Sequence, residues 1–457
     1  MAEKERNDDS TGKFEGKPGH GKRILLRTFG CQMNEYDSEL VTAILLSAGF
    51  SFVDSEDLAD VILLNTCSVR DNAQRKIFGL VHEIRHRAGG RDLLVGILGC
   101  LAGHWKEDLV GNPRWRIDFA VGPDQYNDLP RIIANAAGHK QDVFAFEFSD
   151  EELYEGIYPA RVEGVNAWIA VTRGCDNFCS YCIVPYARGR ERSRSIKSIL
   201  DEARRLAKDG FKQVTLLGQN VNSYQYDGVD FADLLAEVSR IDGIRRIRFM
   251  SPHPKDFSEK LMALVAANPK ICKHMHFPMQ SGNTRILKKM NRTYTKTGYL
   301  QKVKMIRGYC PDIALTTDVI VGFPTETDAE FEDTYDVMRR VEFDAAFIFK
   351  YSPRKGTLAE RKYPDDVPPE IKTERIVRLN ALQKEMSLKK NQAMIGRIEE
   401  VVIEVDTTKK SDQDAQGRTE SNKIVILPPG DYHQGDFVSV KIKSATPHVV
   451  RGIISNN

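Results

Sequence analysis

The sequence has no strong charge imbalance, no long apolar run and few cysteines. Its 66 lysines and arginines nearly balance 64 acidic residues, for a net charge of +2, so bulk charge argues neither for nor against a nucleic-acid partner. The longest uncharged apolar run, Leu93 to Gly103, is well short of the ~18 residues that suggest a membrane span. The first 22 residues mix acids and bases without an apolar core, which excludes a secretory signal and predicts a solvated, disordered tail.

Eight cysteines among 457 residues do not make a disulfide framework in a chain without an export signal. We therefore expect reduced thiols in a cytoplasmic protein, with ligation or catalysis as their role. Hydrophobic residues make up 41% of the chain, as in ordinary globular proteins, and the length predicts about three domains of ~150 residues each.

Three successive patterns predict an α/β multidomain protein. From Arg23, buried-strand runs alternate with helical stretches, which is typical of an open parallel sheet. The less regular stretch 121–159 then leads into six further strand–helix repeats, which favour a partial (βα)6 barrel with a lateral opening. Beyond a one-sided helix, alternating segments predict a small antiparallel β-barrel. The expected parts are the tail (1–22), the sheet domain (23–150), the partial barrel (151–393) and the C-terminal barrel (394–457).

The densest chemical signal is the segment GCDNFCSYC, which places Cys175, Cys179 and Cys182 directly after a predicted strand. Three thiolates this close together select an iron–sulfur cluster or zinc. A closed zinc site needs a fourth ligand, and no histidine lies between His139 and His253. On a four-iron cluster, three cysteines would leave one iron open to a substrate or cofactor. Three structural thiols are the alternative interpretation.

Three further cysteines, Cys31, Cys67 and Cys100, each follow a separate N-terminal strand. Open α/β sheets place their sites at the carboxyl edge of parallel strands, so we expect these thiols to converge in a second three-cysteine cluster site. Each alone could instead be a small buried apolar residue. Cys272 and Cys310 share no such placement and are interpreted as structural.

Basic residues gather in two stretches. One is YARGRERSRSIK, and the other runs from Thr284 to Lys304 with seven bases and no acid. Such a run is usually a solvated helix face, but beside a cluster loop it could bind the phosphates of a polynucleotide or the carboxylate of a cofactor. In the C-terminal barrel, only the loop GRTESNK offers phosphate donors.

Taken together, these motifs make the chain resemble the radical S-adenosylmethionine methylthiotransferases over essentially its whole length after residue 22. CDNFCSYC and the following VPYARGRERSR resemble the radical-SAM cluster motif, and TFGCQMN, NTCSVR and GC resemble the N-terminal methylthiotransferase domain. The C-terminal barrel resembles a TRAM domain, a small RNA-binding module. Among subfamilies, GQNVNSY, SPHPKDF, HFPMQSGN and GRTESN are most similar to the branch that acts on N6-isopentenyladenosine beside the tRNA anticodon.

Two positions depart from the family pattern. The segment GFPTET carries Thr325 where the family often has glycine, and Leu101 and Ala102 stand where Ala-Gln often follows the third auxiliary cysteine. The first departure bears on how closely a ligand approaches the backbone of this loop, and it leaves the reaction class unchanged.

The resemblance implies a tRNA-modifying enzyme that adds a methylthio group to C2 of N6-isopentenyladenosine at tRNA position 37. It implies two [4Fe-4S] clusters, with all six cysteines above as metal ligands and catalytic residues. Cys175, Cys179 and Cys182 would hold the cluster that binds and reductively cleaves S-adenosylmethionine, which is both radical source and methyl donor. Cys31, Cys67 and Cys100 would hold the auxiliary cluster that carries sulfur.

The resemblance also gives candidate contacts and partners. The candidates for S-adenosylmethionine are Gln219, Gln280, Ser281, Arg292 and Gly322, at or just after the carboxyl ends of barrel strands. The candidates for RNA are Arg188, Asn220, Arg418, Asn422 and Lys423. The expected partners of this monomer are the tRNA anticodon stem-loop and an electron donor such as flavodoxin or ferredoxin, with no membrane.

Two kinds of alternative stay open at this point. One is the same chemistry on threonylcarbamoyladenosine of tRNA or on a ribosomal-protein aspartate, which the GQN segment argues against. The other is an iron–sulfur RNA-binding or redox-sensing module without turnover. Cleavage of S-adenosylmethionine to deoxyadenosine separates the second kind from an enzyme.

Overall fold

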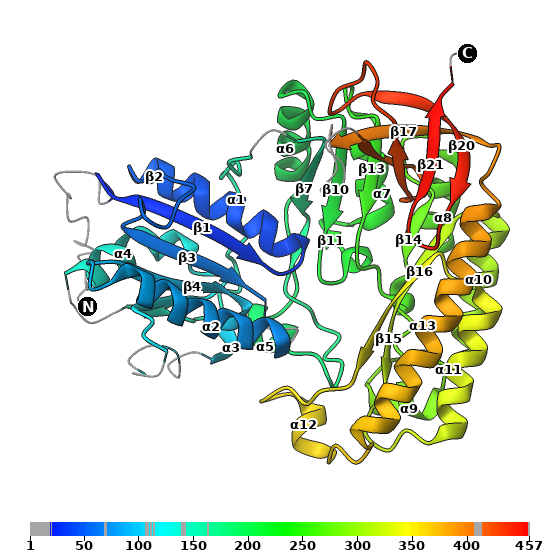
Figure 1. Ribbon diagram of the computed structural model, residues 1–457, viewed down its shortest axis with the longest axis horizontal. Coiled ribbons are helices and arrows are strands. Elements are labelled where there is room, and N and C mark those ends of the chain that lie inside the picture. The colour runs from blue at the N-terminus through cyan, green and yellow to red at the C-terminus, as the bar shows by residue number, and fades with distance from the viewer. Residues whose placement is uncertain are drawn as a thin grey trace, which may run out of the picture. The chain divides into compact units, whose positions relative to one another are not determined.

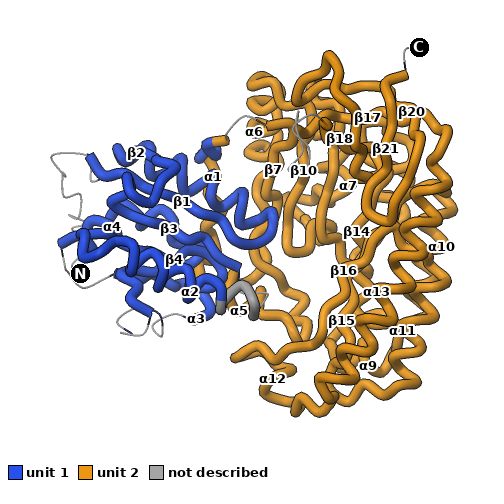
Figure 2. Tube along the Cα trace, viewed as in Figure 1, with its two compact units in different colours: residues 1–147, 157–160 blue, residues 148–156, 161–457 orange. Residues whose placement is uncertain are grey.

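The structure, a computed structural model, describes residues 19, 21–67, 71–105, 109, 112, 115–138, 143–161, 164–405 and 414–455, with the backbone alone for 71–75. The chain forms two compact units, residues 1–147 with 157–160 and residues 148–156 with 161–457 (Figure 2). The expected tail lies almost entirely outside the described residues. No described helix combines the length and apolarity that a bilayer crossing requires.

The first unit is a parallel sheet with strand order β2-β1-β3-β4-β5-β6 (Figure 1). Strands β3 and β4 are buried at every position, as expected for parallel strands covered on both faces. The strands are β1 (Arg23–Phe29), β2 (Ser51–Phe52), β3 (Val61–Thr66), β4 (Leu94–Gly99), β5 (Phe119–Val121) and β6 (Phe144–Ala145). The helices are α1 (Gln32–Ser47), α2 (Asp71–Ala88), α3 (Cys100–Trp105), α4 (Leu129–Ala137) and the 3-10 turn η2 (Tyr126–Asp128).

The parallel sheet confirms the predicted fold class, but the stretch 121–159 is more regular than expected. It contains the amphipathic helix α4, which buries Ile132 and Ile133, and the edge strand β6. The strands here are too short to show the pattern that reveals a strand in a sequence.

The second unit contains six barrel strands, and all of their pairings are parallel. They are β7 (Asn166–Ala170), β10 (Gln213–Leu217), β13 (Arg246–Phe249), β14 (His274–His276), β15 (Ala314–Val321) and β16 (Ala345–Lys350). A bridge between Ile247 and Ile271 joins the β7–β10–β13 sheet to the β14–β15–β16 sheet. Among the described residues nothing pairs β7 with β16, so the predicted partial barrel with an open side is confirmed.

Helices follow the strands of this partial barrel, and long ones such as the last of them pack on its outside. They are α5 (Val184–Arg188), α6 (Ile196–Lys208), α7 (Phe231–Ser239), α8 (Glu259–Ala267), α9 (Thr284–Lys289), α10 (Lys296–Tyr309), α11 (Asp328–Val341), α12 (Leu358–Lys362) and α13 (Pro369–Gln392). Side-chain oxygens at the N-caps of seven of them, α6 through α12, accept first-turn N–H groups, which fixes where these helices begin. Short elements lie in the connections: β8 (Thr172–Arg173), β9 (Arg192–Ser193), β11 (Gln225–Tyr226), β12 (Val229–Asp230), η3 (Val221–Ser223) and η4 (Pro254–Asp256).

The inner face of the barrel is identified by the burial pattern of β15. Leu315, Val319 and Val321 are fully buried, whereas Asp318 and Ile320, between them in sequence, are partly exposed. Successive side chains of a strand point to opposite faces, and helices such as α13 contact β15 and β16 on the outside (Figure 1). The partly exposed set therefore lines the inside of the open barrel.

The C-terminal part is a closed barrel with order β17-β18-β19-β21-β20. Its strands are β17 (Ile398–Val405), β18 (Ala415–Thr419), β19 (Ile424–Leu427), β20 (Phe437–Ala445) and β21 (Val450–Ile454). The predicted antiparallel barrel is confirmed, with one exception: β19 and β21 pair in parallel. The segment GRTESN, predicted as a loop, lies partly in β18. Its inward residues are small, and a Cβ at Gly417 would lie 2.4 Å from the Val401 side chain, so no hydrophobic alternation marks this strand.

This C-terminal barrel closes the amino-terminal end of the partial barrel. Arg248 of β13 donates hydrogen bonds to the backbone oxygens of Thr419 (2.7 Å) and Glu420 (3.0 Å). Arg246 donates to the backbone oxygens of Arg418 (2.9 Å) and Glu400 (2.6 Å). Both arginines are buried. The turn after β18 therefore forms a floor beneath the barrel interior.

Replacing Arg248 by alanine should lower the free energy of unfolding by about 2–4 kcal/mol, because two hydrogen bonds from a buried cation are lost and two carbonyls stay buried without them. The matched control is Arg240→Ala. Arg240 is largely exposed and pairs with Glu237 one turn away, so its loss should cost about 0.5 kcal/mol. Urea unfolding of the two variants measures the difference, and equal losses would contradict a buried anchoring role for Arg248.

Candidate functional site

The cysteines of the first unit follow the carboxyl ends of three adjacent strands. Phe29 of β1 lies opposite Thr66 of β3, and Thr66 lies opposite Gly99 of β4. Cys67 and Cys100 directly follow these positions, and Cys31 is the N-cap of α1, two residues after Phe29. Adjacent strands are about 4.8 Å apart, so one sheet edge carries all three thiols.

Two buried asparagines tie this edge together. Asn34 Nδ2 donates to Asn65 Oδ1 (3.0 Å), and Asn65 Nδ2 donates to the backbone oxygen of Asn34 (2.9 Å). The Cys31 thiol donates to Asn34 Oδ1 (3.4 Å). A Cβ at Gly99, which has a φ of +83°, would lie 2.5 Å from Asn65 Oδ1, so glycine is required before Cys100. Both asparagines stand in the motifs TFGCQMN and NTCSVR, yet the sequence alone does not single them out.

The cysteines of the second unit lie on the loop after β8. Cys175 and Cys179 are buried and Cys182 is partly exposed. A Cβ at Gly174 would lie 1.9 Å from the backbone oxygen of Arg190, so the chain enters this loop through an obligatory glycine. Burial raises the pKa of Cys175 to about 11 and also raises the pKa of Cys182. These thiols are therefore protonated at neutral pH and would release protons on binding metal.

The segment after α9 clamps this loop. Ser180 donates from its backbone N–H to Met290 O (2.9 Å) and from its hydroxyl to Lys289 O (2.8 Å). Asn291 Nδ2 donates to the backbone oxygen of Phe178 (3.0 Å). The cysteine loop is thereby held to a segment more than a hundred residues away in sequence.

Arg292, at the end of this clamp, directly contacts the cysteine loop. Its Nη1 lies 3.4 Å from Cys179 Sγ, its Nε donates to the Tyr294 hydroxyl (2.9 Å), and its Nη2 donates to Pro278 O (3.2 Å). The residue is buried, and no carboxylate of the described residues forms an ion pair with it. A buried guanidinium without an acidic partner fits an anionic group bound beside Cys179.

His253 is a site residue that sequence reasoning missed. Its Nδ1 accepts the Lys255 N–H (3.1 Å), and its ring lies 5.9 Å from that of Tyr294. Burial and the charge of Arg292 lower its pKa to about 2, so the ring is neutral and its proton is on Nε2. Among the described residues this buried donor has no hydrogen-bond partner, which points to a ligand as its acceptor. The only signal in the sequence is the motif SPHPKDF.

The other candidates for S-adenosylmethionine differ in what they leave for a ligand. Gln219 keeps a buried Oε1 that no donor of the described part of the chain reaches. Gln280, at a φ of +65°, bridges to β15 through its backbone, and Ser281 contacts the Thr334 hydroxyl (3.4 Å). Gly322 donates its N–H to Glu326 Oε2 (2.6 Å). Among the described residues, Gln219 is thus the one of these four whose side-chain acceptor is both buried and unpartnered.

Thr325 occupies a backbone conformation that favours glycine, with a φ of +69°. A β-branched residue there is strained. Its hydroxyl accepts hydrogen bonds from Lys289 Nζ (2.7 Å) and Arg285 Nη1 (3.1 Å), which offset part of that cost. The departure from the family's glycine is accommodated by these two basic residues.

The candidates for RNA contact are largely engaged within the protein. Arg418 pairs with Glu404 (2.6 Å), and Lys423 pairs with Asp344 (2.8 Å). Asn422 Oδ1 accepts from Arg418, and Asn220 Nδ2 donates to Asp256 Oδ2 (2.7 Å). Arg188 is buried at the end of α5. These contacts stabilise the second unit and its floor.

The basic run YARGRERSRSIK is not a solvated face, because its arginines are mostly buried. Arg194 pairs with Glu202 at 2.7 Å, and Arg161 contacts the same carboxylate. Arg190 is exposed, stacks over Phe178 and pairs with Asp176 at 3.3 Å. The run therefore organises the surroundings of the cysteine loop.

The donor chemistry fits iron–sulfur clusters both at the sheet edge of the first unit and on the cysteine loop of the second, since each place offers three thiols and little else. Within the described ranges, no three side chains of histidine, cysteine, aspartate and glutamate surround a point as ligands of one metal ion would. A four-iron cluster is wider than one ion and takes each thiolate on a separate iron, so ligands spread along a strand edge or loop suit it better than zinc.

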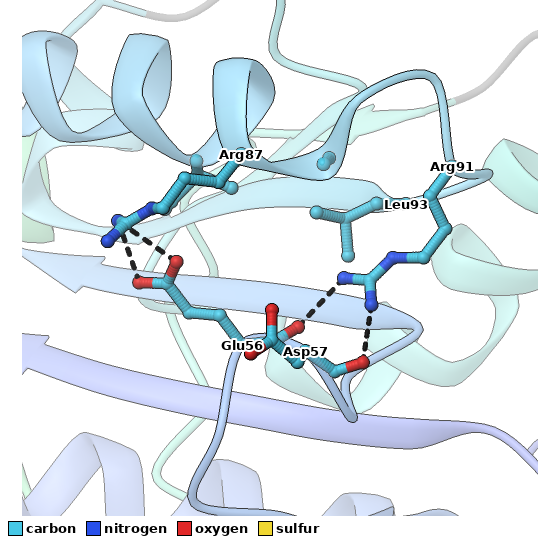
Figure 3. A pocket seen from close by; sticks show the side chains of 7 residues that line it. Glu56, Asp57, Arg87, Arg91 and Leu93 are labelled. Carbon is cyan, nitrogen blue, oxygen red and sulfur yellow. Dashed lines mark hydrogen bonds and ion pairs between the residues drawn. The ribbon is translucent and has the colours of Figure 1, made fainter.

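A small pocket in the first unit lies at the opposite edge of the sheet from the cysteines. Figure 3 shows Arg87 paired with Glu56, and Arg91 donating to the backbone of Glu56 and Asp57. Glu56 and Asp57 precede β3, whereas Cys67 follows it. Its charged groups neutralise one another, so the pocket offers no reactive group.

Comparison with family models matches three segments of the chain. Residues 23–122 match the uncharacterized protein family UPF0004, residues 169–338 match the radical SAM superfamily, and residues 392–454 match the TRAM domain. The cysteines at the two edges fall in the first two segments.

Curated relatives match nearly the whole chain. A tRNA-2-methylthio-N(6)-dimethylallyladenosine synthase of Porphyromonas gingivalis is 44% identical over 94% of each chain. One of Phocaeicola vulgatus is 42% identical over 94% of this chain and 95% of its own. Among solved structures, the radical S-adenosylmethionine methyltransferase TsrM of Kitasatospora setae matches with a TM-score of 0.55 and 16% identity, covering 74% of this chain and 77% of that one. This last likeness concerns the fold alone.

Proposed function

Because this chain belongs to the tRNA-2-methylthio-N(6)-dimethylallyladenosine synthase family, we propose that it adds a methylthio group to C2 of N6-isopentenyladenosine at tRNA position 37. It is a radical SAM enzyme, and S-adenosylmethionine and iron–sulfur cofactors follow from its family. We further propose that the iron–sulfur cofactors are two [4Fe-4S] clusters.

The observation that carries this proposal is the presence of two separate sets of three cysteines. One set lies at the sheet edge of the first unit, and the other lies on the loop after β8 in the second unit. A module for electron transfer or sensing typically holds its cluster with four protein ligands. Each of the two cysteine sets here supplies only three, which leaves one iron of each cluster open. S-adenosylmethionine and its cluster together supply a carbon radical able to attack an aromatic C–H bond, and the auxiliary cluster supplies sulfur. Cys175, Cys179 and Cys182 would hold the first cluster, and Cys31, Cys67 and Cys100 the second.

Hydrogen bonds within the chain hold the two cysteine sets in place. Asn34 and Asn65 fix the Cys31 segment against β3, and the clamp after α9 fixes the second loop. Arg292 places a positive charge against Cys179 Sγ, which would stabilise a negatively charged cluster or the cofactor carboxylate. His253 and Gln219 hold a donor and an acceptor for the polar groups of S-adenosylmethionine.

The TRAM domain and the family's reaction support tRNA as the partner. Since Arg418 and Lys423 are engaged in ion pairs, the phosphates of the anticodon stem-loop would meet other cations. Lys441 and Lys443 of β20 are exposed and have no ion-pair partner among the described residues. We also propose that the protein is a monomer in the cytoplasm. A flavodoxin or ferredoxin would supply its electrons.

Incubation of the reconstituted protein with tRNA, S-adenosylmethionine, a sulfide source and a reductant should yield 2-methylthio-N6-isopentenyladenosine, measured by mass spectrometry of the digested nucleosides. Unprenylated tRNA should bind with similar affinity, because phosphates dominate affinity, but give at least tenfold less product. Equal turnover of both tRNAs would contradict the assigned substrate.

A further inference from the structure

The inner face of the partial barrel carries an exposed aromatic side chain beside a carboxylate. Phe347 of β16 is 53% exposed, although it lies on the inward side of a barrel strand. Its register partner on β15 is Asp318, whose side chain is 30% exposed. Asp318 lies three residues before the end of β15, about 10 Å below the carboxyl edge.

His276 holds this carboxylate in place. Its Nε2 lies 3.1 Å from Asp318 Oδ2, and its Nδ1 lies 3.0 Å from Thr316 Oγ1. The Phe347 ring packs edge-on against the imidazole, with centroids 6.1 Å apart. Among the described residues, His276 is the hydrogen-bond partner of the Asp318 carboxylate, and Oδ1 accepts no hydrogen bond. A fixed acceptor therefore faces the barrel interior next to an apolar ring.

Two buried or nearly buried cations are engaged at the floor below this layer. Arg248 donates to the carbonyls of the floor, and Lys423 pairs with Asp344, three residues before Phe347. They close the interior from below, and no lysine or arginine of the described residues pairs with Asp318. The layer thus lies between a floor and the edge that carries the cofactor candidates.

We infer that Phe347, Asp318 and His276 form the seat of the extruded target base, with the adenine stacked on Phe347 and its N6–H donated to Asp318 Oδ1. This inference rests on the proposed function and names the residues that select its substrate. Bases that undergo chemistry leave their stack and are typically stacked on aromatic side chains and read through their polar edges. An uncharged prenyl group fits beside an exposed phenyl ring.

The same layer explains selectivity against the rival substrates. A threonylcarbamoyl group and a ribosomal-protein aspartate each carry a carboxylate, which Asp318 would repel at short range. Like-charge contact in a partly desolvated site is an effective means of excluding a wrong ligand. The seat presents the Asp318 carboxylate and the Phe347 ring to its ligand. A substrate that carries a carboxylate would instead need a cation at this place.

The first test uses an anticodon stem-loop with N6-isopentenyladenosine at the target position and 2-aminopurine beside it. Its fluorescence should rise on binding to the wild-type protein, as the target base leaves the stack. Phe347→Ala should lose at least half of this rise while its RNA affinity, measured by anisotropy, stays within about threefold, because phosphates set affinity. Its kcat/KM for methylthio product should fall about tenfold or more. The control, Tyr309→Ala, removes an exposed aromatic of α10 and should match the wild type.

The second test measures competition between stem-loops carrying isopentenyladenosine and threonylcarbamoyladenosine. Asp318→Asn should reduce the wild-type preference for the first about fivefold to tenfold. An unaltered fluorescence rise in Phe347→Ala, or an unaltered preference in Asp318→Asn, would overturn the seat. Failure of the proposed function is distinguishable, because the wild-type protein would then form no methylthio product from tRNA that carries N6-isopentenyladenosine.

Discussion

Replacing Cys175, Cys179 and Cys182 together by alanine is expected to halve the iron content of the reconstituted protein, from about eight to about four atoms per chain, and to abolish deoxyadenosine formation. The reason is that these three thiols lie together on one loop of the second unit. Ser180 and Asn291 hold this loop to the segment after α9, and Arg292 contacts Cys179. Iron and sulfide analysis and chromatography of deoxyadenosine after addition of reductant measure the two effects.

A matched control for this variant is Cys272→Ala. Cys272 is buried, as Cys175 and Cys179 are, but it lies before β14, near the floor and away from the cysteine loop. Its removal should leave iron content and deoxyadenosine formation unchanged. Iron content that stays at the wild-type level in the triple variant would show that the loop is not a cluster site.

Replacing Cys31, Cys67 and Cys100 by alanine should also remove about four iron atoms per chain, but with a different chemical result. Cleavage of S-adenosylmethionine should continue at a rate within about twofold of wild type, since its cysteine loop belongs to the other unit. Methylthio product should disappear, because the proposed sulfur-carrying site is lost. Mass spectrometry of tRNA nucleosides measures product, and deoxyadenosine measured in the same reaction is the internal comparison.

The two triple variants serve as controls for each other. Each should retain one cluster with its own absorption, so neither loss can be attributed to general unfolding. Full product formation after loss of Cys31, Cys67 and Cys100 would exclude the auxiliary role of that edge, whatever the iron content.

The strands that carry the cysteines were predictable because they are short, continuous apolar runs, and a parallel sheet brings their carboxyl ends to one edge. The contacts that complete the site were not. Arg292 and Cys179 are 113 residues apart in sequence, and nothing in a local pattern relates them. His253 is distinguished only by a donor left unpartnered in the folded protein.

The basic segments were hard to interpret from the sequence, because the partners of their charges lie far away along the chain. A charge run is interpreted as solvated because isolated charges avoid burial. Arg194 of the run YARGRERSRSIK is nevertheless buried and pairs with Glu202, a carboxylate that Arg161 also contacts. Likewise, Arg418 and Lys423 look like phosphate donors until Glu404 and Asp344 are seen to pair with them. A sequence gives the number of charges in a segment but not the distant partners that take them out of solvent.

The floor of the partial barrel is held through main-chain oxygens. Arg246 and Arg248 bind the carbonyls of Arg418, Thr419 and Glu420, and every amino acid supplies such a carbonyl. The hydrogen bonds from the two arginines therefore do not depend on which side chains stand at these three positions, provided that the backbone path is kept. The terminal module can in this way acquire a new outer surface, suited to a different RNA, without compensating changes in the two arginines beneath it.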